Sequence, residues 1–210
     1  MPAAARRLRA PARREQIVAA ATPLFARLGF RGTTTRLVAE RAGVNEAILF
    51  RHFATKEDLY WAVLEAKRLT AASTWTPPSD AAAADIESAL AELAADILRR
   101  STSDATLTRL LFFCALERHR LSDRYFASYG AQRVDDLSHF LRACMRARRL
   151  RETDPRAAAR AFLGMVVYRF LVHELFGGKR REKLDIPHVS RELAHLWLDG
   201  LRPRRRGRAA

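Results

Sequence analysis

The chain has 210 residues, of which 49% are hydrophobic, and its formal net charge is +15. This length allows one domain or two small ones with a buried core, and the hydrophobic share excludes a largely disordered protein. So strong a positive charge indicates a polyanionic partner. Alanine, leucine and arginine are abundant, while there are only 9 glycines and 8 prolines. We therefore expect an all-α protein of about nine helices.

Most of the excess positive charge lies at the two ends of the chain. Ten arginines belong to these ends: Arg6, Arg7, Arg9, Arg13, Arg14, Arg202, Arg204, Arg205, Arg206 and Arg208. We expect a basic flexible arm over residues 1–14 and a basic flexible tail over residues 202–210. Such ends either contact DNA or serve solubility alone.

The cysteines and the apolar runs indicate the compartment. Cys114 and Cys144 lie in apolar or helical surroundings without a CxxC partner, which favours buried thiols in a reducing cytoplasm. The basic start leads directly into an amphipathic pattern, so no signal peptide is expected. The most apolar run, residues 162–168, is too short to span a bilayer. The predicted location is the cytoplasm, without membrane contact.

Four helices are expected before the paired prolines 77–78. The first carries apolar residues at helical spacing and ends at Gly29: Ile17, Ala20, Ala21, Leu24, Phe25 and Leu28. Thr34 can cap a second helix over 35–42, and a third runs from 45 or 46 to about 53. Thr55 opens the fourth with a near capping box that has Asp58 in place of Glu.

The turn between the second and third expected helices combines a glycine stop with a cap residue. Gly43 stands where the second helix must stop, and glycine accepts the left-handed backbone that such a stop needs. Asn45 follows as a candidate N-cap for the third helix. Two short helices joined by a tight glycine-containing turn form a helix-turn-helix, whose second helix reads the DNA major groove.

Five further helices are expected after the prolines. Their starts are marked by Asp80, Asp104, Ser122, Asp154-Pro155 and Pro187. The helix after Pro155 is apolar on two sides, so it needs a second packing partner. We divide the chain into a DNA-binding domain over 15–55, a connecting helix over 56–76, and an effector-binding and dimerisation domain over 79–201.

The stretch from Gly29 to Leu59 resembles the DNA-binding signature of the tetracycline repressor (TetR) family of bacterial transcriptional regulators. The similarity rests on many positions at fixed spacing: Gly29-Phe30, Thr33-Thr34, Val38-Ala39, Ala42-Gly43-Val44-Asn45, Leu49-Phe50, Phe53 and Lys56-Glu57-Asp58-Leu59. The rest of the chain resembles the family only in length and helical pattern. The resemblance implies a ligand-responsive regulator, commonly a repressor, that binds a palindromic operator as a homodimer and is released by a small molecule.

The resemblance and the helix register together suggest which residues meet double-stranded DNA. They are Thr34, Arg36, Asn45, Glu46, Ala47, Ile48, Phe50, Arg51, His52 and Lys56. Ile48 can pack on a thymine methyl group or belong to the core, and Arg51 can contact guanine or phosphate. Phe50 replaces the tyrosine usual in the family, which removes a hydroxyl contact to phosphate. Glu46 is unfavourable near phosphates unless it accepts from a cytosine amino group.

The second half is expected to bind a small, mostly apolar effector and to dimerise. Candidate effector residues are Trp61, Trp75, Phe113, Cys114, Glu117, Phe126, Tyr129, Phe140 and His173, with solid core as the alternative for each of them. Candidate dimer residues are Ala158, Ala161, Met165, Tyr168, Val172, His195 and Trp197, with an intramolecular core as the alternative. We expect no cofactor and no metal, although His188, Glu192 and His195 can share a helix face.

An enzyme and a non-specific DNA-binding protein are the two alternatives to a regulator. The chain has no phosphate-binding Gly-rich loop, no GxSxG and no HExxH, so an enzyme is not expected. A basic protein that binds DNA without sequence preference is the better alternative. It explains the arginine-rich ends but not the helix-turn-helix.

Overall fold

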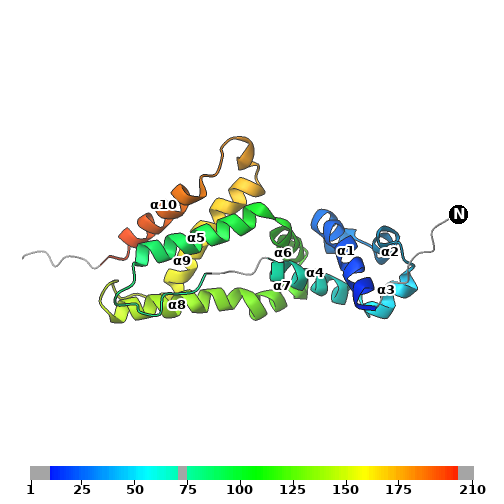
Figure 1. The fold of residues 1–210 in the computed structure, drawn as a ribbon, viewed down its shortest axis with the longest axis horizontal. Helices are drawn as coiled ribbons and strands as arrows, with labels where there is room; N and C mark the ends of the chain where they lie inside the picture. The colour runs from blue at the N-terminus through cyan, green and yellow to red at the C-terminus, as the bar shows by residue number, and fades with distance from the viewer. Residues whose placement is uncertain (1–9, 71–74, 203–210) are drawn as a thin grey trace, which may run out of the picture. The chain divides into compact units, whose positions relative to one another are not determined.

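The computed structural model of the chain describes residues 10–70 and 75–202. Over these residues all regular structure is helical, as the sequence predicts (Figure 1). The helices before the paired prolines are α1 (Ala10–Gly32), α2 (Thr35–Ala42), α3 (Glu46–His52) and α4 (Lys56–Thr70). The later elements are α5 (Ile86–Ser103), α6 (Thr106–Leu116), α7 (Arg120–Tyr125), the π-helical turn η1 (Phe126–Gly130), α8 (Ala131–Arg146), α9 (Pro155–Glu174), the 3₁₀ turn η2 (Gly178–Arg180) and α10 (Ile186–Asp199).

The structure describes only part of the two basic ends. Residues 1–9 of the predicted arm and 203–210 of the predicted tail lie outside the described residues. Residues 10–14 were also predicted to belong to the arm, but they form the start of α1. The Arg14 guanidinium lies 4.8 Å from the centre of the Phe53 ring, a cation–π contact that ties the start of α1 to the end of α3.

The chain forms two compact units, and each is described here by itself. The N-terminal unit contains α1–α4 together with α6 and α7, and the C-terminal unit contains α5, η1, α8, α9, η2 and α10. The predicted effector domain over 79–201 is therefore not one compact unit. Its residues 106–125 pack with the N-terminal helices because Leu110 and Cys114 are fully buried in that core.

The core of the N-terminal unit is built around aromatic side chains from α1 and α4. Phe25 and Tyr60 are fully buried and meet edge to face, with ring centres 4.7 Å apart. The Tyr60 hydroxyl donates to the Leu110 carbonyl at 2.6 Å, so the polar end of this buried ring is satisfied by α6. Burial also raises the pKa of Tyr60 above its usual value. This arrangement fixes α6 to the helices that carry α2 and α3.

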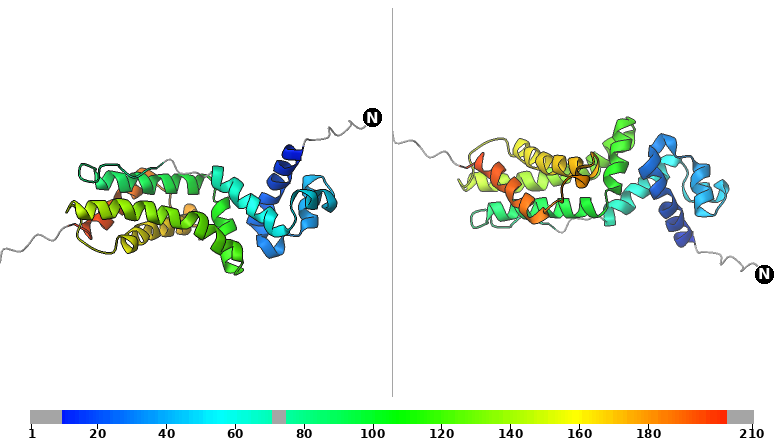
Figure 2. Two further views of the ribbon diagram at one scale, coloured as in Figure 1. Left: turned by 90° about the horizontal axis from the view of Figure 1, so that it is seen from below. Right: turned by 90° about the horizontal axis from the view of Figure 1, so that it is seen from above.

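The C-terminal unit is a bundle of α5, α8, α9 and α10, which lie lengthwise beside one another (Figures 1 and 2). Leucines of α5 and α8 pack against the apolar side of α9, whose Phe162 meets Trp197 of α10 edge to face at 5.6 Å. The buried carboxylate of Asp96 on α5 is paired with Arg100 at 2.6 Å. The bundle thus buries this charged group with a partner, as an apolar interior requires.

Several helix starts agree with the sequence prediction, and two do not. Asp154 caps α9 ahead of Pro155 by accepting the Arg156 N–H at 2.9 Å, as predicted. Helix α5 starts six residues later than predicted: Asp80 forms an isolated turn, and Asp85 is the cap. Ser122 lies inside α7 and caps nothing, since its hydroxyl donates to the His119 carbonyl.

Among the helices of residues 10–70 and 75–202, none has the length and apolar character needed to cross a membrane.

Candidate nucleic-acid interface

Helix α2 and the turn after it are held by local hydrogen bonds that the sequence predicts. Thr34 Oγ1 accepts the Leu37 N–H at 3.1 Å and caps α2. Gly43 has φ 64° and ψ 35°, and its N–H bonds back to the last turn of α2. The Val44 N–H completes this stop by donating to the Ala39 carbonyl at 3.0 Å. The chain is therefore turned sharply between α2 and α3.

Helix α3 starts at the predicted cap and presents two distinct faces. Asn45 Oδ1 accepts the Ile48 N–H at 2.8 Å. Leu49 is fully buried and anchors α3 in the core, followed by Phe53 at the helix end. Ala47, Phe50 and Arg51 lie on the opposite face and are exposed, at the i, i+3 and i+4 spacing of one helix face. This short helix thus offers a free apolar and cationic surface.

Not every predicted DNA residue is equally available. Glu46, Ile48 and His52 are half-buried flanks of α3, so Ile48 is neither fully outward nor core. Val44, in the turn before α3, is also half-buried. Thr34 and Arg36 are exposed on α2, and Arg36 forms an ion pair with Glu40 at 3.0 Å, which raises its pKa.

The structure assigns Glu46 a contact that the sequence did not suggest. Its Oε1 accepts the Thr35 hydroxyl at 2.6 Å, which joins the start of α3 to the start of α2. A hydrogen bond to a carboxylate is stronger than one between neutral groups, so this contact helps to hold the two helix starts together. This contact gives the carboxylate a structural partner close to a predicted phosphate-binding surface.

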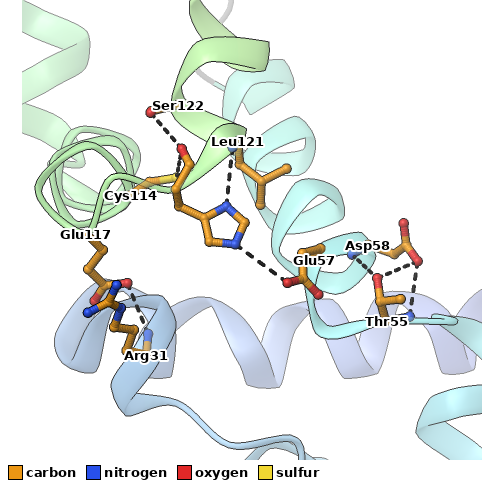
Figure 3. A network of polar contacts seen from close by, with 9 residues as sticks. Arg31, Thr55, Glu57, Asp58, Cys114, Glu117, Leu121 and Ser122 are labelled. Atoms are coloured by element: carbon orange, nitrogen blue, oxygen red, sulfur yellow. Dashed lines mark hydrogen bonds and ion pairs between the residues drawn. The ribbon is translucent and has the colours of Figure 1, made fainter.

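The start of α4 is closed by its own side chains. Thr55 Oγ1 accepts the Asp58 N–H at 3.1 Å, and Asp58 Oδ2 accepts the Thr55 N–H at 3.1 Å, so aspartate completes the predicted capping box (Figure 3). The Lys56 ammonium lies 4.4 Å from the centre of the Phe30 ring, and burial lowers its pKa. Both features make this helix start a less open phosphate site than the sequence predicts.

A second network joins α6 and α7 to the end of α1. Glu117 Oε2 accepts the Arg31 backbone N–H at 3.1 Å (Figure 3). Gly29 has φ 73°, and a Cβ added there would collide with Glu117 Oε1 and lie 3.0 Å from the Phe113 ring. His119 Nδ1 accepts the Leu121 N–H at 3.3 Å. The end of α1 is therefore shaped to receive α6.

The candidate effector residues of the N-terminal unit already have structural contacts. Cys114 is fully buried, and burial raises the pKa of its thiol to about 11. Glu117 and Phe113 meet the end of α1. The Arg124 guanidinium lies over the Trp61 ring, 3.8 Å from its centre, in a cation–π contact. We expected these side chains around an effector, and the structure shows that they also bind the unit together.

The candidate effector residues of the C-terminal unit are dispersed. Phe140 belongs to the buried core and also lines a hollow of about 310 Å³, together with Pro77 and Pro78. His173 is buried and lines a different hollow of about 480 Å³. The Trp75 Nε1–H donates to the Ala89 carbonyl at 3.0 Å. The other two aromatic candidates differ in exposure: Phe126 is exposed and Tyr129 is half-buried.

The predicted dimer surface needs correction. Ala158 and Trp197 belong to the core of their own unit, because the bundle helices already cover them. Tyr168, Ala161 and His195 are exposed, and Met165 and Val172 are half-buried. The sequence missed Val167 and Leu196, which are exposed apolar residues on α9 and α10. Helical periodicity alone could not assign these residues to the outer face, because α9 is apolar on both sides.

Comparison with known proteins finds a family match for the helix-turn-helix part of the chain and another for its C-terminal part. Residues 17–63 match the family described as "Bacterial regulatory proteins, tetR family". Residues 88–194, half of the chain, match the family described as "AefR-like transcriptional repressor, C-terminal domain". The HTH-type transcriptional repressor Rv3405c of Mycobacterium tuberculosis is 46% identical over 68 residues, which cover 30% of this chain and 36% of that protein. The alignment thus spans little more than a third of this relative.

Solved structures share the fold over nearly the whole chain. A putative TetR-family regulator from Mesorhizobium loti has a TM-score of 0.68 at 19% identity, and the match covers 93% of this chain and all of that one. AibR in complex with isovaleryl coenzyme A and operator DNA has a TM-score of 0.65 at 19% identity, over 89% and 98% of the two chains. Since its helix-turn-helix and its C-terminal half both match, the chain belongs to the TetR family of bacterial transcriptional regulators.

Proposed function

We propose that this regulator is a repressor that binds a palindromic operator as a homodimer and is released by a small-molecule effector, acting in the cytoplasm without an enzymatic role. The observation that carries the proposal is the geometry of α3. Buried Leu49 and the cap at Asn45 fix the helix, while Ala47, Phe50 and Arg51 face solvent. A rigid short helix with one free face is what insertion into a major groove requires.

The exposed face of α3 supplies complementary contacts for DNA. Arg51 is suited to the two acceptors of a guanine edge or to a phosphate. Phe50 is 46% exposed, and its ring together with the Ala47 methyl offers an apolar surface to thymine methyl groups. Thr34 and Arg36 on α2 are placed for phosphate contacts, which position the protein but do not read sequence.

Dimerisation is supported by apolar side chains left exposed on the C-terminal bundle. Val167 and Tyr168 on α9 and Leu196 on α10 are 41%, 68% and 65% exposed. These helices would pack against the same pair of a second chain in a four-helix arrangement. The two recognition helices would then be separated by one DNA turn, about 34–36 Å.

Effector release is supported by the composition of the N-terminal unit and by a related structure. Helices α6 and α7 pack with α1 and α4, so a ligand that shifts them acts on the elements that hold α3. AibR was solved with both isovaleryl coenzyme A and operator DNA. By analogy, we propose that an effector binds the DNA-incompetent state of this protein more tightly; a preference of about 100-fold corresponds to roughly 2.7 kcal/mol.

The test is selection of bound sequences from a random duplex library near physiological salt, because affinity for DNA falls steeply with salt. We expect a palindromic motif. The Arg51→Ala variant should bind that motif with a loss of about 1–3 kcal/mol and relaxed preference at one position of each half-site. Arg27→Ala removes another exposed arginine of the same unit, away from α3, and should keep the motif. Enrichment of no motif would instead support a sequence-non-specific basic protein.

A further inference from the structure

The hollow lined by His173 lies under the loop between α9 and α10. It has a volume of about 480 Å³ and is bordered by Thr102 at the end of α5, by the loop residues 179–184, and by Ile186 at the start of α10. This volume falls within the range of small-molecule sites, about 300–1,000 Å³. The hollow is too small for a macromolecule but sufficient for a small ligand.

The charge around this hollow is strongly unbalanced. One glutamate, Glu182, lines the hollow and is paired with Arg169 at 2.9 Å. Two further carboxylates belong to adjoining residues: Glu174 pairs with Lys179 at 3.2 Å, and Asp185 caps α10 by accepting the His188 N–H at 3.0 Å. Three further cations line the hollow and have no ion-pair partner within residues 10–70 and 75–202: Arg180, Arg181 and Lys183.

The loop that carries these cations is fixed against the end of α9. Gly177 has φ 79°, and the Arg180 guanidinium folds over it, so that a Cβ added there would lie 2.5 Å from this group. A Cβ on Gly178 would lie 2.8 Å from the Val172 carbonyl oxygen. The absence of a side chain at Gly178 therefore lets the loop lie directly on the end of α9.

Part of the lining of the hollow is apolar. Leu184 and Ile186 line it while packing against the core of the C-terminal unit. A ligand with one carboxylate would neutralise only one of the three cations. Guanidinium groups match phosphate oxygens in a bidentate manner, and three clustered cations suit an anion with several negative charges.

We propose that this hollow, with Arg180, Arg181 and Lys183 at its rim, binds the phosphate groups of a small molecule that carries at least two of them. The site differs in chemistry from the mostly apolar effector site expected from the sequence. DNA is the other source of phosphate, but a hollow of this size suits a small anion better than a duplex.

The experiment is calorimetric titration of the full chain with inorganic pyrophosphate at constant ionic strength. We expect saturable binding of one pyrophosphate per chain. The triple variant R180Q/R181Q/K183Q should bind about tenfold more weakly or worse, since each charge-assisted hydrogen bond contributes strongly. A matched triple variant, R142Q/R146Q/R151Q, removes the same charge from exposed positions elsewhere on the C-terminal unit and should bind within about twofold of wild type.

Other results would overturn the proposal. They are absence of saturable binding to the wild type, equal losses in both triple variants, or unchanged affinity in R180Q/R181Q/K183Q. Affinity for random-sequence duplex is measured in parallel. A larger loss of duplex affinity in the loop variant than in its control, without a loss for pyrophosphate, would assign these cations to DNA. The titration needs no operator, so its failure leaves the proposed repressor function untouched.

Discussion

Single residues decide how the N-terminal unit is held together, and glycines show this most clearly. Gly29 combines a left-handed backbone with direct contact to Glu117 and Phe113. Gly43 is left-handed but has open space around it, while Gly164 lies in α9 with open space and ordinary helical geometry. A side chain at Gly29 would meet both backbone strain and a steric collision, one at Gly43 would meet strain alone, and one at Gly164 would meet neither.

We expect alanine substitutions at these glycines to have graded effects on the free energy of unfolding. Gly29→Ala should lose about 2–4 kcal/mol from strain and collision together. Gly43→Ala should lose about 1–2 kcal/mol from strain alone. Gly164→Ala should gain up to about 1 kcal/mol, because alanine favours a helix. Urea unfolding followed by circular dichroism measures all three. A Gly29→Ala variant as stable as wild type would show that α6 does not pack on α1 as described.

The buried thiol of Cys114 makes a pH-dependent contribution. Burial raises the pKa of this thiol from 9.0 to about 11, so the folded state holds the proton more tightly than the unfolded state. Its contribution to stability is therefore complete below pH 9 and is lost as the pH rises towards 11, by up to about 2–3 kcal/mol. The Cys114→Ala variant lacks this pH-dependent contribution to stability. Tyr60, whose pKa burial also raises, is present in both proteins, so the comparison isolates the thiol. Urea unfolding between pH 8 and 10.5 should show a steeper loss for wild type; parallel profiles would contradict a buried thiol.

At the scale of elements, α3 depends on contacts at its two ends and on one bond to α2. The Asn45 side chain caps its start, Leu49 buries its inner face, and the Glu46–Thr35 bond joins it to the start of α2. A helix of this length is not stable alone. The recognition surface thus exists only because neighbouring helices hold it.

Removing the Asn45 cap should weaken both stability and DNA binding. Asn45→Ala removes the side-chain acceptor of the Ile48 N–H and should cost about 1 kcal/mol. Asn45→Ser keeps a capping oxygen and should stay within about 0.5 kcal/mol of wild type. The free energy of unfolding and the affinity for the selected duplex are measured together. If the serine variant binds DNA as poorly as the alanine variant while keeping stability, Asn45 contacts DNA directly.

The sequence predicted those elements whose signals are local. Gly43, Asn45 and the Thr55–Asp58 box act within four residues, and all three are found as expected. The start of α5 was misplaced because Asp80 and Asp85 offer the same local signal and only packing selects between them. Contacts between distant parts of the chain were not predictable from periodicity.

The Glu117–Arg31 bond illustrates such a distant contact, since it joins residues 86 positions apart. Glu117 was predicted as an effector contact from its polar character among apolar neighbours, and nothing local marked α1 as its partner. The same limit applies to Leu196, whose exposure depends on which side of α10 the bundle covers. Nothing local marks Arg180 and Arg181 as part of a binding site, because the hollow beside them is also lined by Thr102 of the distant helix α5.

At the scale of the whole molecule, the proposed function requires two copies. One α3 helix reads only a few base pairs, so specificity for an operator needs a second recognition helix on a fixed spacing. In the proposed dimer, the exposed apolar side chains on α9 and α10 would supply the surface for this pairing. Affinity for DNA and dimerisation should therefore be coupled.

The most direct test of this account is the number of chains bound to the selected duplex, measured by sedimentation of the protein with a full palindrome and with a single half-site. We expect two chains on the full palindrome, bound at least about tenfold more tightly than on the half-site. The Leu196→Glu variant places a charge in the proposed interface and should lose this advantage, whereas Leu116→Glu changes another exposed leucine and should keep it. One chain per duplex, with equal affinity for both duplexes, would contradict a dimeric operator-binding repressor.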